Sequence, residues 1–128
     1  PNIDVFKEQL DLFLQMLTEA APTKEQSKNM DFMLGAGQLF TLIAYSQLIL
    51  ENAKIYDVDT DVIDEIFAFM VRDYSEYALQ LVLNHDLTDA QEAKLQSMIK
   101  KPVLDASRFN RVWDKHVFPL KDTYVMNE

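Results

Sequence analysis

The sequence predicts an all-α fold, an up-and-down antiparallel bundle of four long helices plus one shorter helix. Apolar residues recur every third or fourth position along several stretches, and this spacing puts them on one face of a helix. The 128 residues include only two glycines and four prolines, while 48% are hydrophobic. Such a composition suits a packed core, and the length suits one domain, so we expect residues 1–128 to form a single helical bundle. Short connections favour antiparallel neighbours.

The first helix is expected over Ile3–Ala20, with Asn2 as its N-cap, because the side-chain oxygen of asparagine accepts a free first-turn amide. Ala21-Pro22 ends it, since the residue before proline avoids the helical region. One apolar stripe runs along this helix and comprises Ile3, Phe6, Leu10, Phe13 and Leu17.

The second helix is expected over Lys24–Tyr56, beginning at a capping box formed by Thr23 and Gln26. One face carries Met30, Met33, Leu34, Gly37, Phe40, Ala44, Leu48 and Glu51, and leucines and isoleucines fill much of the rest. A helix that is apolar nearly all round is predicted to be the central helix. Gly35 and Gly37 cost about 1 kcal/mol each against alanine, which indicates close packing there or, as the alternative, the approach of a ligand.

Three further helices follow. The third begins at Asp59 or Thr60 and ends at Asn84-His85-Asp86, and its stripe contains Ile63, Ile66, Phe67, Met70, Tyr74, Tyr77, Ala78 and Leu81. The fourth is capped by Thr88, with Gln91 at the box position, and stops at Pro102. The fifth is capped by Asp105 or Ser107, and its stripe holds Phe109, Val112, Trp113, His116 and Val117. The tail from Leu120 to Glu128 is expected as a short helix or an extended segment.

Phe32–Leu50 has 19 residues without a charge, which is within the range of a transmembrane helix. Its glutamines are costly in lipid, and no Lys/Arg cluster flanks it to set an orientation. We therefore predict a buried helix and no membrane span.

The 21 acids and 12 bases give a net charge of -9, but they are unevenly distributed. Asp57–Glu92 holds ten acids and one base, whereas Lys100–Glu128 holds six bases and four acids. The acidic middle argues against nucleic acid as a partner, since phosphate binding needs a basic surface. One interpretation is a solvated face; the other is that the basic tail, or a basic partner, docks on the acidic middle.

Residue types that carry chemistry are sparse. Cysteine is absent, which excludes thiolate chemistry and favours a cytoplasmic protein. Asp57, Asp59 and Asp61 imitate a calcium loop, but its required glycine and glutamate are missing, so capping is the better reading. His85 and His116 lack the spacing of paired metal ligands or a nucleophile partner. We predict no catalytic residue and no metal site. The residues at which a pocket or close packing is expected are Gly35, Gly37, Tyr45 and His116.

Several segments are distinctive beyond their helical pattern: Gly37–Ala53 (GQLFTLIAYSQLILENA), Ile63–Phe67, Val71–Leu79, Lys101-Pro102-Val103 and Arg108–Trp113. They resemble the carboxyl-terminal helical region of acyl-CoA dehydrogenase-like proteins, and the likeness spans roughly residues 30 to 115. Members of that family place FAD between domains and subunits and remove two hydrogens from an acyl-CoA thioester with a glutamate base. The chain has no β-rich segment, and none of its acids matches that glutamate. The resemblance therefore assigns no catalytic or flavin residue here, and FAD is expected only in a full-length family member.

The resulting functional hypothesis is a non-catalytic helical packing or assembly module, whose partner is a second copy of itself or the remainder of a flavoenzyme. A homo-oligomer is expected. Two alternatives remain open: a stand-alone adaptor whose groove takes a partner helix, and a small ligand-binding helical protein. Pro1 is compatible both with removal of an initiator methionine and with a fragment of a longer protein.

Overall fold

The computed structural model describes residues 1–123, and these are helical with no strand among them. The elements in chain order are α1 (Asn2–Glu19), α2 (Lys24–Lys28), α3 (Met30–Tyr56), α4 (Thr60–Asn84), α5 (Asp89–Ser97), α6 (Ala106–Val112), a π-helical turn (Trp113–Val117) and a 3₁₀ turn (Phe118–Leu120). The all-α prediction is confirmed. Three helices are long instead of the four expected, because the segment after Thr88 forms only nine residues of helix. Most of the predicted tail lies outside the described residues.

The predicted helix over Lys24–Tyr56 is two helices. Asn29 breaks it, with φ −83° and ψ 109°, and is both the C-cap of α2 and the N-cap of α3. Its side-chain oxygen accepts the Phe32 N–H at 3.2 Å. Asparagine competes with the helix for backbone groups in this way, and so a cap replaces the continuous helix.

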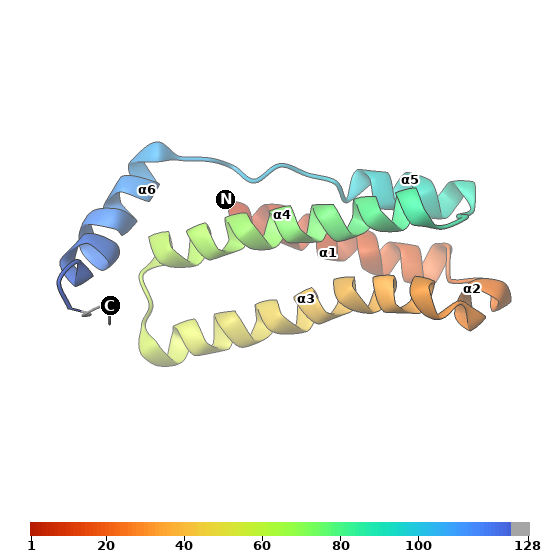
Figure 1. Ribbon diagram of the computed structural model, residues 1–128, viewed down its shortest axis with the longest axis horizontal. Helices are drawn as coiled ribbons and strands as arrows, with labels where there is room; N and C mark the ends of the chain where they lie inside the picture. The colour runs from red at the N-terminus through yellow and green to blue at the C-terminus, as the bar shows by residue number, and fades with distance from the viewer. Residues whose placement is uncertain (124–128) are drawn as a thin grey trace, which may run out of the picture.

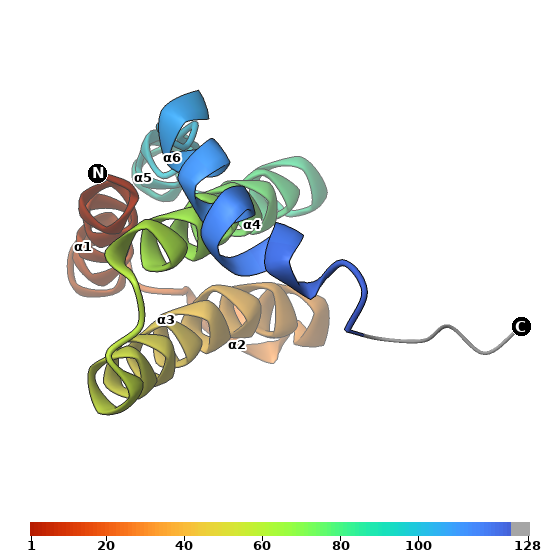
Figure 2. The same cartoon turned by 90° about the vertical axis from the view of Figure 1, so that its left-hand side faces the viewer.

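The helix at the centre of the molecule is α4. It runs antiparallel to α3 on one side, while α1 and α5 pack against it on the other (Figures 1 and 2). Nine of its residues are buried, against four for the longer α3. The prediction that the most apolar helix is central is therefore wrong: α3 lies at the edge and contacts mainly α4 and α2.

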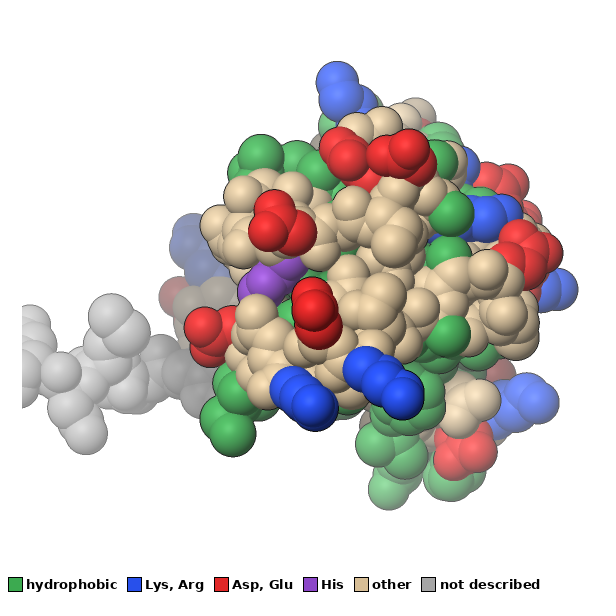
Figure 3. Space-filling model, turned by 90° about the vertical axis from the view of Figure 1, so that its right-hand side faces the viewer, with side chains coloured by type: hydrophobic (Ala, Val, Ile, Leu, Met, Phe, Trp, Pro, Cys, Tyr) green, Lys and Arg blue, Asp and Glu red, His purple; other side chains and the backbone are tan. Residues whose placement is uncertain are grey.

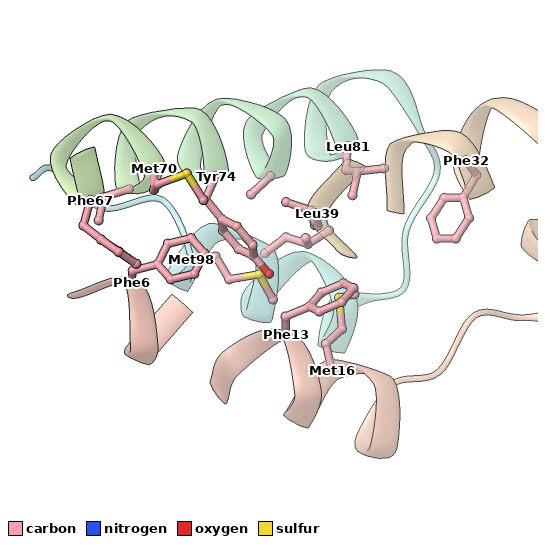
Figure 4. Packing of buried hydrophobic residues seen from close by; sticks show 13 residues of the cluster. Phe6, Phe13, Met16, Phe32, Leu39, Phe67, Met70, Tyr74, Leu81 and Met98 are labelled. Atoms are coloured by element: carbon pink, nitrogen blue, oxygen red, sulfur yellow. The ribbon is translucent and has the colours of Figure 1, made fainter. Parts of the chain in front are cut away.

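The core lies between α1, α3, α4 and α5 (Figure 4). Phe6 of α1 meets the rings of Phe67 and Tyr74 edge-on, with both pairs of centroids 5.5 Å apart. The α4 stripe was predicted correctly at Phe67, Met70, Tyr74, Ala78 and Leu81, which are all buried. The α1 stripe was only half correct, because the buried residues are Asn2, Phe6, Gln9, Phe13 and Met16.

Two polar side chains of α1 are buried next to positions where an apolar residue was predicted in the core: Gln9 beside Leu10, and Asn2 beside Ile3. Gln9 Nε2 donates to the carbonyl of Met98 at 2.8 Å and to Ser75 Oγ at 2.9 Å. These bonds offset the cost of burying the amide donor, and they connect α1 to α4 and to the end of α5. The prediction that Asn2 caps α1 is wrong, because the N-cap is Pro1 and no side chain bonds the first turn there. The Asn2 side chain instead bonds Asp64 and the backbone of Val103.

The other predicted caps are largely confirmed. Thr23 with Gln26, and Thr88 with Gln91, form complete capping boxes. Their glutamines also bond each other, with Gln26 Nε2 donating to Gln91 Oε1 at 2.8 Å. The two short helices are thereby joined at one end of the molecule. Asp59 caps α4 and Asp105 caps α6.

Candidate functional site

The outer face of α3 is the largest apolar feature that the described residues expose. We define it by seven large side chains that are 44% to 76% exposed: Met30, Met33, Leu34, Phe40, Tyr45, Leu48 and Ile55. Most of the apolar face recognised in the sequence is here, but it points away from the core.

The opposite side of α3 explains this orientation. Its buried residues are Phe32, Leu39, Ser46 and Ala53, which recur every seven residues and form one narrow seam against the rest of the molecule. A seam of this kind uses only part of the helix circumference. Leu42, Ile43, Ile49 and Leu50 flank this seam and pack, partly buried, against the core. The seven residues of the outer face are not among the residues that pack against the core of the described chain.

By length and composition α3 is also able to cross a membrane, and it is the one helix of the described residues with this property. Only 11% of its most apolar 18-residue window is buried. A helix at the core of a soluble bundle would be mostly buried, so the apolar run of α3 requires another explanation.

The area of the outer face is large for a monomer. If a large apolar side chain offers roughly 200 Å², the seven exposed fractions correspond to roughly 900 Å². The largest apolar patch on a typical monomeric protein is about 300–600 Å². A patch above that size is typical of an interaction site.

The two glycines of α3 have different environments. A Cβ added to Gly35 would lie 2.6 Å from Leu81 Cδ2, so this glycine permits the close approach of α3 and α4. A Cβ on Gly37 would meet nothing within 4 Å. Close packing within the chain, as predicted for both residues, therefore accounts for Gly35 and not for Gly37.

Alanine at these two positions is expected to have opposite effects on the free energy of unfolding of the isolated chain. Gly37→Ala should raise it by about 0.5–1 kcal/mol, because alanine favours the helix and the site is open. Gly35→Ala gains the same propensity but crowds the buried Leu81 side chain, so we expect a net loss of about 1 kcal/mol. Urea unfolding followed by circular dichroism measures both. Equal changes in the two variants would contradict the assigned roles.

The other two residues of the predicted pocket lie elsewhere. Tyr45 is exposed on the outer face of α3. His116 lies in the π-helical turn after α6, and its Nε2 is 3.1 Å from Asp59 Oδ2 at the start of α4. Of the four residues, Gly35 alone lines either of the two surface hollows found in the described part of the chain.

The basic carboxyl-terminal segment docks on the acidic start of α4, as one interpretation of the charge pattern predicted. The guanidinium of Arg108 bonds Asp64 and, through Nε, Glu65 at 2.8 Å. Arg111 holds Asp61 with two bonds of 2.8 and 3.0 Å. These contacts bring α6 across the end of the molecule at which α4 begins (Figure 2).

Two carboxyl groups where the carboxyl-terminal segment meets the start of α4 have a lowered pKa. The pKa of Asp59 is lowered by its hydrogen bond with His116 and by the Asp61 N–H, and the pKa of Asp61 is lowered by its hydrogen bond with Arg111. A lowered folded-state pKa contributes stability above the unfolded pKa, near 3.8, and this contribution is lost as the pH falls through the folded value.

The docking of α6 is therefore expected to persist at pH 5 and to weaken below about pH 3.8. Trp113 is the only tryptophan of the chain and lies just after α6, so its fluorescence anisotropy reports the docking. Asp61→Asn removes one of the two titrating carboxylates and should reduce the acid transition. An anisotropy that is flat between pH 6 and pH 2 would contradict this assignment.

A hollow of about 570 Å³ lies at the other end of the molecule, between α2 and the connection from α4 to α5. It is lined mainly by polar residues, including Glu25, Asn29, His85 and Asp86. Figure 3 views this end, where acidic side chains flank the visible histidine. The His85 ring packs edge-on against Phe32, with centroids 5.5 Å apart. His85 is the C-cap of α4, at the place where the sequence predicts this helix to end.

No family model, curated protein or solved structure matches the chain. Sequence reasoning missed the buried polar residues Asp64, Arg108, Gln9, Ser75 and Asn2. The excess of acids before residue 92 and of bases after residue 100 was the one signal that pointed toward any of them.

Proposed function

We propose that the chain is a non-catalytic helical assembly module whose outer face of α3 packs against an apolar surface of a protein partner. The observation that carries this proposal is the exposure of about 900 Å² of apolar side chain along one helix. Burial of such a surface is favourable by roughly 25 cal/mol per Å² before the costs of association.

The rest of the structure supports a module that presents this face. The central α4 is fixed to α1, α5 and α6, whereas α3 is attached along a single seam. Ion pairs and buried hydrogen bonds connect the other elements to one another. The charged groups with shifted pKa values belong to the α4–α6 contact, where they have a structural role.

The sequence resemblance supplies one class of partner, the helical domain of an acyl-CoA dehydrogenase-like flavoprotein. In that case the module would extend or join the subunits of a flavoenzyme, and FAD would be held by the other domains. We assign no residue of this chain to the flavin or to the acyl-CoA substrate.

The proposal is tested by photo-crosslinking in the cell that produces the protein. A benzophenone side chain in place of Leu48 is expected to form a covalent adduct with a protein partner, and purified adducts are identified by mass spectrometry. The same probe in place of Leu83 is the matched control, because Leu83 is also a largely exposed leucine but lies on α4, outside the outer face of α3.

A specific protein adduct at position 48 that is absent at position 83 supports an assembly role. Equal labelling at both positions, or labelling of lipid alone at position 48, would overturn it. A bound ligand released from the purified chain would favour the ligand-binding alternative instead.

A further inference from the structure

We infer that the partner on the outer face of α3 is a second copy of this chain, paired antiparallel about the middle of α3. This inference rests on the proposed function, because it names the occupant of the same face. It follows from the order of large, small and charged residues along the helix and from the size of the face.

The outer face has the spacing of a coiled-coil seam. Positions 30, 34, 37, 41, 44, 48, 51 and 55 alternate steps of four and three residues, which is the spacing of the two core positions of a heptad. The buried seam of Phe32, Leu39, Ser46 and Ala53 falls at the heptad position opposite to it. One side of α3 therefore contacts its own chain, and the other side is arranged to receive a helix.

The residues of this seam complement one another when two copies run antiparallel. Each core layer then joins different residues: Met30 meets Ile55, Leu34 meets Glu51, Gly37 meets Leu48, and Thr41 meets Ala44. Gly37 leaves space where Leu48 of the second copy needs it. This gives Gly37, which no residue of its own chain contacts at the Cβ position, a reason to lack a side chain.

A parallel arrangement of the same two faces is much less favourable. Each residue would then face its own copy, so Gly37 would oppose Gly37 and leave a gap in the interface. Glu51 would oppose Glu51, and like charges at close range repel. In the antiparallel pair, Glu51 faces Leu34 and no like charge in the seam, near the amino-terminal end of the other α3, and this end of a helix favours a negative charge.

The charge distribution and the area also allow self-association. Asp57–Glu92, with ten acids and one base, accounts for a net charge equal to that of the whole chain, whereas α3 carries only Asp31, Glu51 and Lys54. A stable interface needs about 800 Å² from each partner. The outer face offers roughly 900 Å² of apolar surface on each copy.

Sedimentation equilibrium of the full chain tests the inference, with Leu48→Gln and Leu83→Gln as a matched pair. We expect the unsubstituted chain to dimerise. Each dimer buries Leu48 twice, so Leu48→Gln should weaken dimerisation by roughly a hundredfold, while Leu83→Gln leaves it unchanged. Circular dichroism of both variants confirms that they are folded.

Cysteine pairs test the direction of the two helices, because the natural sequence contains no cysteine. A mixture of Met30→Cys and Ile55→Cys chains is expected to form disulfide-linked heterodimers, and neither variant alone should crosslink. In the antiparallel pair two identical positions at a helix end lie about 38 Å apart, whereas a disulfide needs Cα atoms within about 7 Å.

A monomer at every concentration, or a dimer that Leu48→Gln does not weaken, would overturn the second copy as partner. Efficient crosslinking of Ile55→Cys alone would overturn the antiparallel arrangement. Photo-crosslinking at position 48 separates this failure from failure of the proposed function. An adduct with a different protein would retain the assembly role, while labelling no different from position 83 would remove both.

Discussion

Replacing Arg108 with alanine is expected to lower the free energy of unfolding by about 3–5 kcal/mol. Its guanidinium is almost completely buried and bonds Asp64, Glu65 and the carbonyl of Val103. Without it, the carboxylate of Asp64 stays in a site from which water is excluded, and its remaining partners are Asn2 and the amino group of Pro1. Breaking a buried ion pair on one side has a large effect because the second charge loses its buried partner, and the amino group of Pro1, which is mostly exposed, compensates the charge of Asp64 only in part.

Urea unfolding followed by circular dichroism measures this loss, and Arg111→Ala is the matched control. Arg111 also pairs with an aspartate of α4, but its side chain is about half exposed. Arg111→Ala should therefore lower the free energy of unfolding much less than Arg108→Ala does. Arg108→Met combined with Asp64→Asn removes both charges and should recover much of the stability. Equal losses for the two alanine variants would contradict the burial assigned to Arg108.

The extent and the buried face of α4 were predictable because its apolar residues form a single stripe, with polar residues on the other side. Phe67, Met70 and Tyr74 fall on that stripe and are buried. In α1 the same reasoning chose Leu10 and Leu17. The structure buries Gln9 instead, because the carbonyl of Met98 at the end of α5 gives its amide a partner. That partner is 89 residues away, and a local periodicity contains no information on it.

The position of α3 was mispredicted for a different reason. A helix that is apolar on all sides satisfies the pattern of a central helix and equally that of a helix with two separate contact surfaces. Periodicity found the face that includes Leu34 and Leu48, but it does not distinguish burial within a chain from burial between chains. Only the packing of Phe32 and Leu39 against the core shows which side faces inward.

The contact between α6 and α4 was predictable in outline from charge alone. The individual pairs were not, because Asp64 lies near the start of α4, where acids also favour the helix dipole. An acid at this position therefore has a sufficient local explanation. The pairing of Asp64 with Arg108 depends on the path of residues 98–105, which run back along α4 to α6 (Figure 1).

The second large effect is expected at Tyr74, the largest fully buried side chain. Its ring packs edge-on against Phe6 and Phe13, with centroids 5.5 and 6.4 Å away. Tyr74→Ala should lower the free energy of unfolding by about 3–5 kcal/mol, since it removes these contacts and leaves a cavity in the centre of the core.

Tyr74→Phe is expected to act in the opposite direction. Within residues 1–123 the hydroxyl has no hydrogen-bond partner, and burial raises the pKa of this phenol well above its ordinary value. A buried hydroxyl without a partner is destabilising, so its removal should raise the free energy of unfolding by about 1 kcal/mol while the ring contacts remain. Thermal and urea unfolding of the unsubstituted chain, Tyr74→Ala and Tyr74→Phe separate the contribution of the ring from that of the hydroxyl. A loss of stability in Tyr74→Phe would show that the hydroxyl is bonded in solution, and the core would then contain a polar contact at the junction of α1 and α4.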